Sequence, residues 1–307
     1  MTKPLNELTI AEAAKGLRAH EFSVRDLWTA CVSAASARNG ALNAFLEIFD
    51  ADDAAIVAAQ KRIDEEGQKA PLLCGIPLAT KDNILVQGRI ASASSKILSN
   101  YRAVYDATVV AKLKEAGALF LGRTNMDEFA LGGSTENSAF GPTKNPYDET
   151  RVAGGTSRGS AAAVAAHLAI GALGTDTGGS VRNPASYCGL VGMKPTYGVV
   201  SRSGLIAAVS SFDQAGPLAH TVSDARAIYD TIRGKDLLDS TSIELVAPSR
   251  KETKKIGVLR SLMGDSLAED MRARFDQTLE ALEGYEIVDI DISSIEPALA
   301  AYYIINF

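Results

Sequence analysis

Two clusters rich in glycine and hydroxyl residues are the part of this sequence most able to carry chemistry. They read Gly154-Gly-Thr-Ser-Arg-Gly-Ser160 and Gly174-Thr-Asp-Thr-Gly-Gly-Ser180, and an alanine-rich stretch separates them. Eleven of the 26 glycines fall within the 51 residues from Gly154 to Gly204. Glycine lets the backbone approach a ligand closely and adopt positive φ. A helix that starts after such a loop offers unpaired N–H groups to an anion, so the clusters predict a binding or catalytic site.

A phosphate-binding loop is the first interpretation of these clusters. Gly154 and Gly159 have the spacing of the two glycines in the Walker motif, but Ser160 stands where that motif requires lysine. Without the lysine, no side chain of the loop reaches the outer phosphates of a nucleotide. The sequence therefore argues against a nucleotide site here.

A hydrolase nucleophile elbow is the second interpretation. The run 155–159 fits G-x-S-x-G with Ser157 as nucleophile, and Asp213 and His220 follow in the chain order that such a triad requires. The motif needs a buried strand just before it, whereas the residues 145–151 are polar and interrupted by proline. The sequence therefore argues against a nucleophile elbow at Ser157.

The third interpretation combines Ser180 with Lys81. Successive backbone N–H groups at Gly178 and Gly179 could point at one spot, as an oxyanion hole requires. Ser180 then follows as a nucleophile that needs a base, and a lysine can be that base if burial lowers its pKa. Lys81 directly follows the apolar run 76–80. Spacing alone leaves two interpretations of Lys81 open, a buried base and a surface lysine at a strand end.

The remaining sequence predicts the elements that position these residues. Segment 1–70 is predicted to be helical, with capping-box patterns that begin at Thr9 and Ser23 and a third helix over 51–66. From 74 to 220, short apolar runs alternate with helical patterns, which is typical of an α/β sheet covered by helices. Strands are expected over 75–80, 118–122 and 190–193, and helices over 108–116, from Asn125 onward, over 160–170 and over 221–232.

The last part of the chain is more polar. Segment 235–255 is predicted to be an exposed connection. A β-α-β unit is expected after it, with strands over 256–259 and 285–292 and a helix over 268–282. The chain stops inside an apolar helix at 304–307, from which we expect that the sequence is cut short.

Composition narrows the class of protein. The chain of 307 residues is 46% hydrophobic and 22% charged, typical of a globular protein. It has no run of about 18 apolar residues and no signal-peptide pattern. Three scattered cysteines suit a reducing cytoplasm and no zinc site. A net charge of −6 argues against a large nucleic-acid surface, so we expect a cytoplasmic protein with no membrane contact and no bound metal.

The two clusters and Lys81 resemble the amidase signature family. Its pattern has Lys-Asp-Asn, then Gly-Gly-Ser-Ser-Gly-Gly-Ser, then Thr-Asp-Thr-Gly-Gly-Ser, and this chain matches these motifs at 81–83, 154–160 and 175–180. The match continues through 188–198 and 211–217. Within the family, the segment 125–146 is most similar to the A subunits of bacterial glutamyl-tRNA(Gln)/aspartyl-tRNA(Asn) amidotransferases. The resemblance covers essentially the whole chain, most loosely from 235 to 307.

The resemblance implies a fold and a reaction. The fold is a single amidase signature domain over 1–307, incomplete at its C-terminus, with a central mixed β-sheet covered by helices on both faces and an N-terminal helical segment. Ser180 attacks the side-chain amide of glutamine, the residue at 156 passes its proton to neutral Lys81, and the N–H groups of Thr177, Gly178 and Gly179 hold the oxyanion. This chain would need no cofactor of its own.

The resemblance also implies partners. Ammonia passes to the B subunit of the amidotransferase, which binds the tRNA and uses ATP and magnesium to activate the misacylated tRNA. The small C subunit holds the other two together in a heterotrimer. The alternatives are a stand-alone amidase of the same family and a catalytically impaired scaffold subunit.

Two departures from the family pattern affect the expected activity. Thr156 stands where the family usually has serine, and its methyl group restricts the rotamer of the relay hydroxyl. Arg158 stands where glycine is expected; its charge would favour a neutral Lys81, while its bulk could distort the loop. We therefore expect reduced rather than absent glutaminase activity.

Overall fold

The computed structural model describes residues 3–134, 136–244, 254–264, 267–290 and 297–306. The chain divides into two compact units, Met1–Leu245 and Val246–Phe307. No helix in the described part of the chain is long and apolar enough to cross a membrane.

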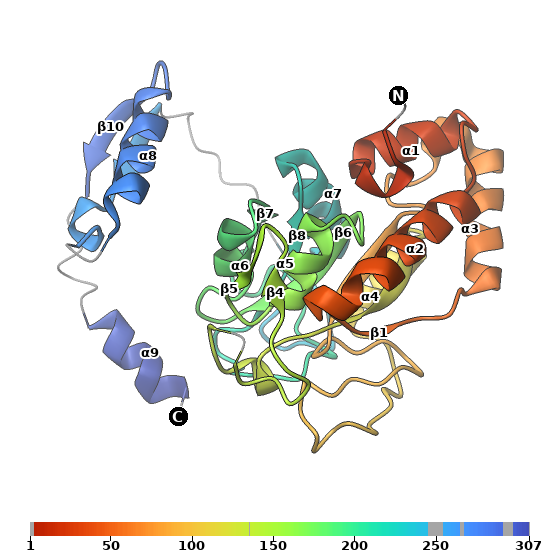
Figure 1. The fold of residues 1–307 in the computed structure, drawn as a ribbon, viewed down its shortest axis with the longest axis horizontal. Coiled ribbons are helices and arrows are strands. Elements are labelled where there is room, and N and C mark those ends of the chain that lie inside the picture. The colour runs from red at the N-terminus through yellow and green to blue at the C-terminus, as the bar shows by residue number, and fades with distance from the viewer. Residues whose placement is uncertain (1–2, 135, 245–253, 265–266, 291–296, 307) are drawn as a thin grey trace. The chain divides into compact units, whose positions relative to one another are not determined.

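A six-stranded mixed sheet forms the centre of the first unit. Its order is β1-β3-β2-β6-β8-β7 (Figure 1). The central strand β2 runs parallel to β3 and β6, and the remaining neighbours are antiparallel. This confirms the predicted mixed sheet. The strands are β1 (Phe45–Ile48), β2 (Pro77–Lys81), β3 (Leu119–Thr124), β6 (Gly171–Asp176), β7 (Val191–Gly192) and β8 (Gln214–Ala219).

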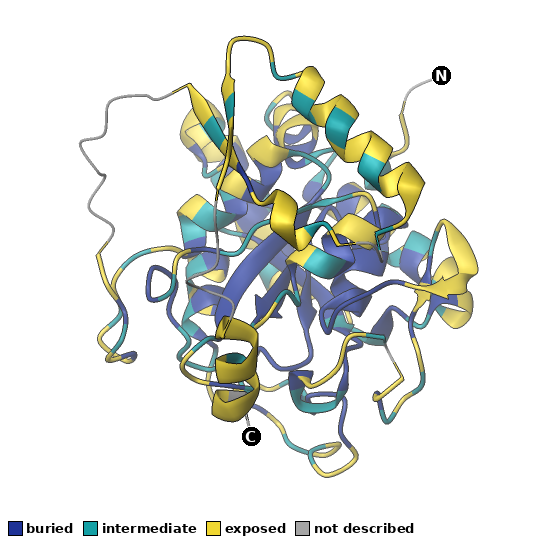
Figure 2. Cartoon of the chain, turned by 90° about the vertical axis from the view of Figure 1, so that its left-hand side faces the viewer, coloured by how far each residue is buried: buried dark blue, intermediate teal, exposed yellow. Residues whose placement is uncertain are grey.

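Helices cover both faces of this sheet, and every residue of β2, β6 and β8 is buried as a result (Figure 2). Helix α5 packs against these three strands, and α2 packs against β1, β2 and β3. The α-helices of the unit are α1 (Ile10–Arg18), α2 (Val24–Leu42), α3 (Asp53–Glu66), α4 (Thr108–Glu115), α5 (Arg158–Ala165), α6 (Arg182–Tyr187) and α7 (Val222–Ile232). Short 3-10 helices lie at η1 (Leu5–Glu7), η2 (Gly67–Lys69) and η3 (Glu128–Ala130).

The predicted helix starts are confirmed in atomic detail. The Thr9 hydroxyl accepts from the Glu12 amide, and the Glu12 carboxylate accepts from the Thr9 amide. Ser23 and Asp26 form the same reciprocal pair before α2. Each pair satisfies two N–H groups that a helix start leaves without partners.

Four predicted elements differ from the structure. Segment 1–70 is not helical throughout, because β1 lies within it and pairs with β3 in the central sheet. No long helix follows Asn125; the segment folds irregularly, with φ of 50° at Phe129 and 60° at Ala130. The alanine-rich helix spans 158–165 rather than 160–170. The strand expected over 190–193 is only the two residues of β7, and they are half-buried.

An antiparallel hairpin of β4 (Lys144–Asn145) and β5 (Asp148–Val152) precedes the first glycine cluster.

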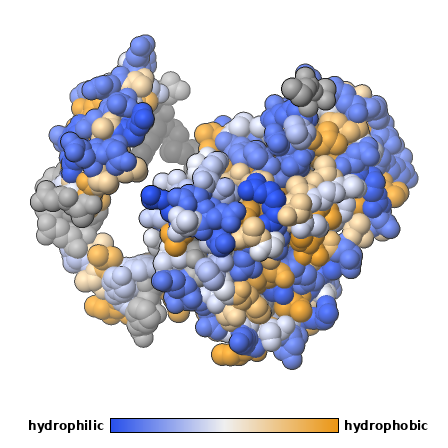
Figure 3. All heavy atoms as spheres, viewed as in Figure 1, coloured by the Kyte–Doolittle hydropathy of each residue, from blue (hydrophilic) through white to orange (hydrophobic). Residues whose placement is uncertain are grey.

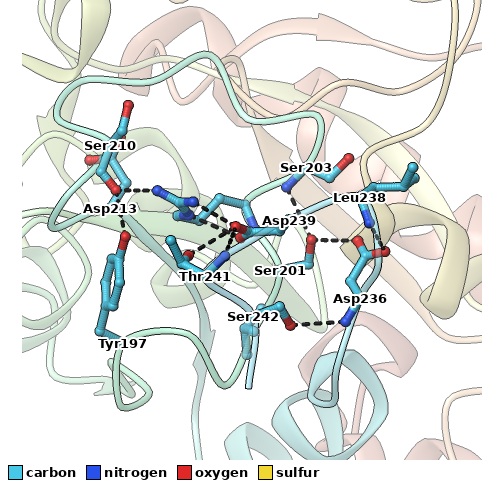
Figure 4. Close-up of polar contacts among 12 residues, drawn as sticks. Tyr197, Ser201, Ser203, Ser210, Asp213, Asp236, Leu238, Asp239, Thr241 and Ser242 are labelled. Carbon is cyan, nitrogen blue, oxygen red and sulfur yellow. Dashed lines mark hydrogen bonds and ion pairs between the residues drawn. The ribbon is translucent and has the colours of Figure 1, made fainter. Parts of the chain in front are cut away.

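Segment 235–244, the described half of the predicted exposed connection, is anchored rather than loose. Leu237 and Leu238 are exposed as expected, but Asp239 is only 6% exposed. Asp236 accepts from the hydroxyl of Ser201 at 2.6 Å (Figure 4). It also accepts from the hydroxyl of Thr108 at 2.5 Å. Residues 245–253 lie outside the described residues, and Lys254 and Lys255, the last two of the predicted connection, are exposed as expected.

The second unit contains the predicted β-α-β arrangement. Strands β9 (Lys255–Val258) and β10 (Glu286–Asp289) pair in parallel, and η4 (Arg260–Leu262) and α8 (Glu269–Glu280) lie between them in the chain. Helix α9 (Ala298–Asn306) follows, and Leu299 and Ile304 are among its exposed apolar side chains. Apolar residues are also seen on the surface of the molecule in Figure 3.

Candidate active site

Strand β2 positions Lys81 as its last residue. The carboxyl ends of parallel strands meet at one edge of a sheet, so Lys81 lies beside the end of β6, where the second glycine cluster begins. The Lys81 side chain is fully buried. Its Nζ donates to Thr156 Oγ1 at 2.7 Å, to Thr175 Oγ1 at 2.7 Å and to the Thr175 carbonyl at 3.3 Å.

Burial lowers the pKa of Lys81 from 10.5 to about 7, because the charged amine is costly away from water. The carboxylates of Asp213, Asp176 and Asp127 oppose this shift, and the guanidinium of Arg158 adds to it. Near neutral pH a large fraction of the amine is therefore uncharged and can accept a proton. The interpretation of Lys81 as a buried base agrees with this geometry, and its interpretation as a surface lysine is wrong.

Thr156 reaches Lys81 from the loop that precedes α5. Gly155 has a φ of +56°, which side chains rarely adopt, and a Cβ there would lie 2.3 Å from Pro184 of α6. Glycine at this position therefore lets the loop lie against α6. The loop buries Thr156 completely and turns its hydroxyl toward Lys81.

Ser157 joins the two glycine clusters. Its amide donates to the Ser180 carbonyl at 3.1 Å, and its hydroxyl donates to the Thr175 carbonyl at 3.0 Å. Ser180 is half-buried between β6 and α6. Among the residues that the structure describes, its Oγ makes no hydrogen bond, so the structure brings the two loops together without bonding Ser180 Oγ to Thr156.

Two of the three predicted oxyanion donors have no acceptor. Within the described residues, the amides of Thr177 and Gly178 make no hydrogen bond. The Gly179 amide instead donates to Asp176 Oδ1 at 2.8 Å, so it is not free in this structure. Asp176 also pairs with Arg182 at 2.9 Å. The loop after β6 therefore offers Thr177 and Gly178 as the amides available to an anion.

Arg158 is accommodated inside the molecule. Its side chain is fully buried, and its Nη1 lies 2.8 Å from Asp127 Oδ1, which is also fully buried. Among the described residues, the Asp127 carboxylate is the one polar group that contacts the guanidinium, whose nitrogens have no further hydrogen-bond partner. The position of Arg158 therefore depends on Asp127. As expected, the charge of Arg158 lowers the pKa of Lys81, although burial lowers it more.

The nucleophile-elbow alternative fails, because its three side chains have other partners. His220 Nε2 lies 2.9 Å from the Val164 carbonyl, and the ring stacks on His167 with centroids 4.5 Å apart. Asp213 accepts from Thr177, and Ser157 Oγ donates to Thr175. No relay from Ser157 to His220 and Asp213 exists in this arrangement.

Sequence reasoning missed three contributors to the site. Thr175 is the second hydroxyl on Lys81, and the register of β6 beside β2 is the signal that could have placed it there. Asp213 is the first of the charges that act on Lys81, and Asp127 pairs with Arg158. No three His, Cys, Asp or Glu side chains gather as a metal site would need, within the part of the chain that the structure describes.

Fold and site together define a mixed α/β protein with a buried lysine, a threonine hydroxyl bonded to it and a nearby serine at one edge of the sheet. The chain belongs to the amidase family, whose family model, described as Amidase, matches residues 26–307.

Its relatives include the A subunit of glutamyl-tRNA(Gln) amidotransferase from Desulfatibacillum aliphaticivorans, which is 46% identical over 98% of this chain and 64% of the relative. The protein of the same name from Chromohalobacter salexigens is 43% identical over 98% of this chain and 64% of the relative. The chain thus spans less than two thirds of the length of these relatives.

Solved structures share the fold. The A subunit of glutamyl-tRNA(Gln) amidotransferase from Thermotoga maritima superimposes with a TM-score of 0.86 at 39% identity, over 100% of this chain and 66% of that one. The peptide amidase of Stenotrophomonas maltophilia gives 0.86 at 32% identity, over 97% and 65%.

Proposed function

We propose that this chain is the glutamine-hydrolysing part of a tRNA-dependent amidotransferase and releases ammonia from L-glutamine. The observation that carries the proposal is the buried hydrogen bond of 2.7 Å between Lys81 and Thr156, because it joins a proton acceptor to a relay hydroxyl. A relative that is 46% identical over nearly the whole chain bears the name of such a subunit.

The proposed reaction begins with neutral Lys81. Ser180 Oγ attacks the side-chain amide carbon of glutamine, while its proton passes through Thr156 to the Lys81 amine. The N–H groups of Thr177 and Gly178 stabilise the developing oxyanion, and Gly179 joins them if its bond to Asp176 opens.

The second half of the reaction reverses the proton path. As the C–N bond breaks, the proton on Lys81 returns through Thr156 to the leaving nitrogen, and ammonia departs. Water then attacks the acyl group on Ser180 and gives its proton to the same relay. As the acyl C–O bond breaks and glutamate leaves, that proton returns to Ser180 Oγ, and Lys81 is neutral again.

The proposed setting is a cytoplasmic heterotrimer in protein biosynthesis. The B subunit binds the tRNA and uses ATP and magnesium, the C subunit holds the other two together, and this chain needs no cofactor. The ammonia converts Glu-tRNA(Gln) to Gln-tRNA(Gln), or Asp-tRNA(Asn) to Asn-tRNA(Asn). The net charge of −6 on this chain agrees with tRNA binding elsewhere.

Glutamine hydrolysis, measured with and without the B and C subunits, tests the proposal. Ser180→Ala should abolish hydrolysis, and Thr156→Val, which keeps the shape but removes the hydroxyl, should lower kcat about 10²- to 10⁴-fold.

Thr156→Ser should raise the rate, since serine lacks the methyl group that restricts the rotamer. The rate should rise with pH through about 7, because only deprotonated Lys81 accepts the proton.

The alternatives predict other results. A stand-alone amidase would hydrolyse simple amides without the B and C subunits; one solved relative, from Stenotrophomonas maltophilia, is named a peptide amidase. An impaired scaffold would show the same labelling by a serine-reactive fluorophosphonate in the parent chain and in Ser180→Ala.

A further inference from the structure

Asp213 lies where the site meets the rest of the sheet. It directly precedes β8, whose residue Gln214 pairs with Asp176 at the end of β6. The Asp213 side chain is buried, yet its carboxylate belongs to no ion pair within the described residues. A buried carboxylate of this kind must be satisfied by hydrogen bonds or by a more distant charge.

Three donors satisfy this carboxylate. The hydroxyl of Thr177 donates to Oδ1 at 2.6 Å. The amide of Ala208 donates to Oδ2 at 2.9 Å, and the amide of Val209 lies 3.2 and 3.1 Å from the two oxygens. One side chain thus ties the oxyanion loop after β6 to the loop 207–213.

The loop 207–213 is itself held in place from the opposite side. The carbonyl of Ser210 accepts from the hydroxyl of Tyr197 at 2.9 Å and from the guanidinium of Arg202 (Figure 4). Arg202 pairs with both oxygens of Asp239, at 2.9 and 2.6 Å. Because these bonds fix the loop that carries Asp213, its carboxylate is a fixed acceptor for Thr177 rather than a mobile one.

We infer that Asp213 is a positioning residue of this site: it holds Thr177, and with it the amides of Thr177 and Gly178, toward the oxyanion, and its carboxylate is one of the charges that act on Lys81. The inference rests on the proposed amide hydrolysis for its catalytic consequence. Its structural content, a tethered loop and a charge felt by Lys81, does not depend on which amide is hydrolysed.

The charge of Asp213 acts together with those of Asp176, Asp127 and Arg158, which also face Lys81. Asp176 is paired with Arg182, and Asp127 with Arg158. Asp213 forms no ion pair among the described residues, although the guanidinium of Arg202, which pairs with Asp239, lies near enough for its charge to interact with that of Asp213. Removing its charge should make the ammonium form of Lys81 less stable, so that Lys81 gives up its proton at lower pH.

The test uses the full chain with 13Cε-labelled lysine, in which the Lys81 signal is assigned by its loss in Lys81→Met. Asp213→Asn should move the Lys81 titration midpoint to lower pH. Asp236→Asn is the matched control, because it breaks hydrogen bonds of the neighbouring segment without removing a charge that faces Lys81; it should leave the midpoint in place.

Thr177→Val tests the tether separately, since valine keeps the shape but lacks the hydroxyl. It should increase hydrogen exchange over residues 177–180 and lower kcat up to about 100-fold, the cost of misplacing a catalytic group by about 1 Å. It should not move the Lys81 midpoint, because Asp213 keeps its charge. Thr177→Ser should recover most of the loss.

An unchanged Lys81 midpoint in Asp213→Asn, or unchanged exchange over 177–180 in Thr177→Val, would overturn the inference. Neither readout needs turnover. If the parent chain shows no Ser180-dependent hydrolysis, the proposed function fails, while the titration and exchange measurements still decide the role of Asp213.

Discussion

At the scale of single residues, the proposed reaction requires the amine of Lys81 to be uncharged. Burial is the main cause of its lowered pKa and Arg158 adds to it, whereas the carboxylates of Asp213, Asp176 and Asp127 raise that pKa. The hydroxyls of Thr156 and Thr175 both bond the amine, so the buried nitrogen has the hydrogen-bond partners that a buried polar group needs. In the proposed reaction, the bond to Thr156 gives the proton a fixed path to Lys81.

The buried ion pair of Arg158 and Asp127 gives a prediction about stability. Arg158→Met leaves a carboxylate buried without its cation, which should destabilise the protein by about 3–5 kcal/mol. The double variant Arg158→Met with Asp127→Asn removes both charges and should recover most of that loss. Urea unfolding of the parent, both single variants and the double variant measures the coupling. Additive losses would show that the pair is not coupled in the folded state.

Helix α5 shows how an element depends on one glycine. The Gly159 amide donates to the Asn125 carbonyl at 3.1 Å, and a Cβ at Gly159 would lie 2.4 Å from that oxygen and 2.5 Å from the Ala44 carbonyl. Two backbone segments therefore lie directly against the first turn of α5. This turn also carries the loop of Thr156, so close packing of the helix and position of the relay hydroxyl are connected.

Gly159→Ala should therefore destabilise the protein by about 1–3 kcal/mol, because backbone must move to make room for the methyl group. Gly40→Ala in α2 is the matched control: nothing lies within 4 Å of its Cβ position. Alanine in an open helical site should stabilise the protein by about 0.5–1 kcal/mol. Thermal unfolding of both variants measures the difference, and equal effects of the two substitutions would contradict this account.

Elements with a local signal were predictable from the sequence. The capping boxes at Thr9 and Ser23 satisfy their own helix starts, so no distant residue is needed to define them. The segment after Asn125 has apolar residues at helical spacing, but its polar side chains bind elsewhere: Asn125 Nδ2 donates to the Gly141 carbonyl, and Asp127 pairs with Arg158. Side chain–backbone bonds of this kind compete with a helix, and they depend on tertiary contacts.

The same distinction applies to the site. Lys81, Thr156 and Ser180 stand out as residue types in motifs, and the structure joins the first two directly. Thr175 and Asp213 could not be ranked from the sequence, because their roles follow from strand register and loop contacts. The inward position of Arg158 depends on Asp127, which is distant from it in the chain.

At the scale of the whole molecule, the two units differ in how much apolar surface they bury. The main hydrophobic core draws its buried residues from Ile10 to Ile232 and includes the central strands. In the second unit Val258 is buried, whereas Met271, Ile304 and other apolar side chains of α8 and α9 are exposed. Since burial of apolar surface is the main stabilising contribution, the first unit should be stable by itself.

Shortening the chain to residues 1–245 should therefore keep a cooperative thermal transition. Its midpoint should lie within about 4 °C of that of the parent, the shift expected for a loss of about 1 kcal/mol in a unit of this size. A chain shortened to 1–213 is the control, because it lacks β8, which pairs with β6 and β7, and α7, which packs on β8; it should show no cooperative transition. Calorimetry distinguishes these outcomes, and a non-cooperative 1–245 would mean that the core up to Ile232 depends on residues 246–307 for its stability.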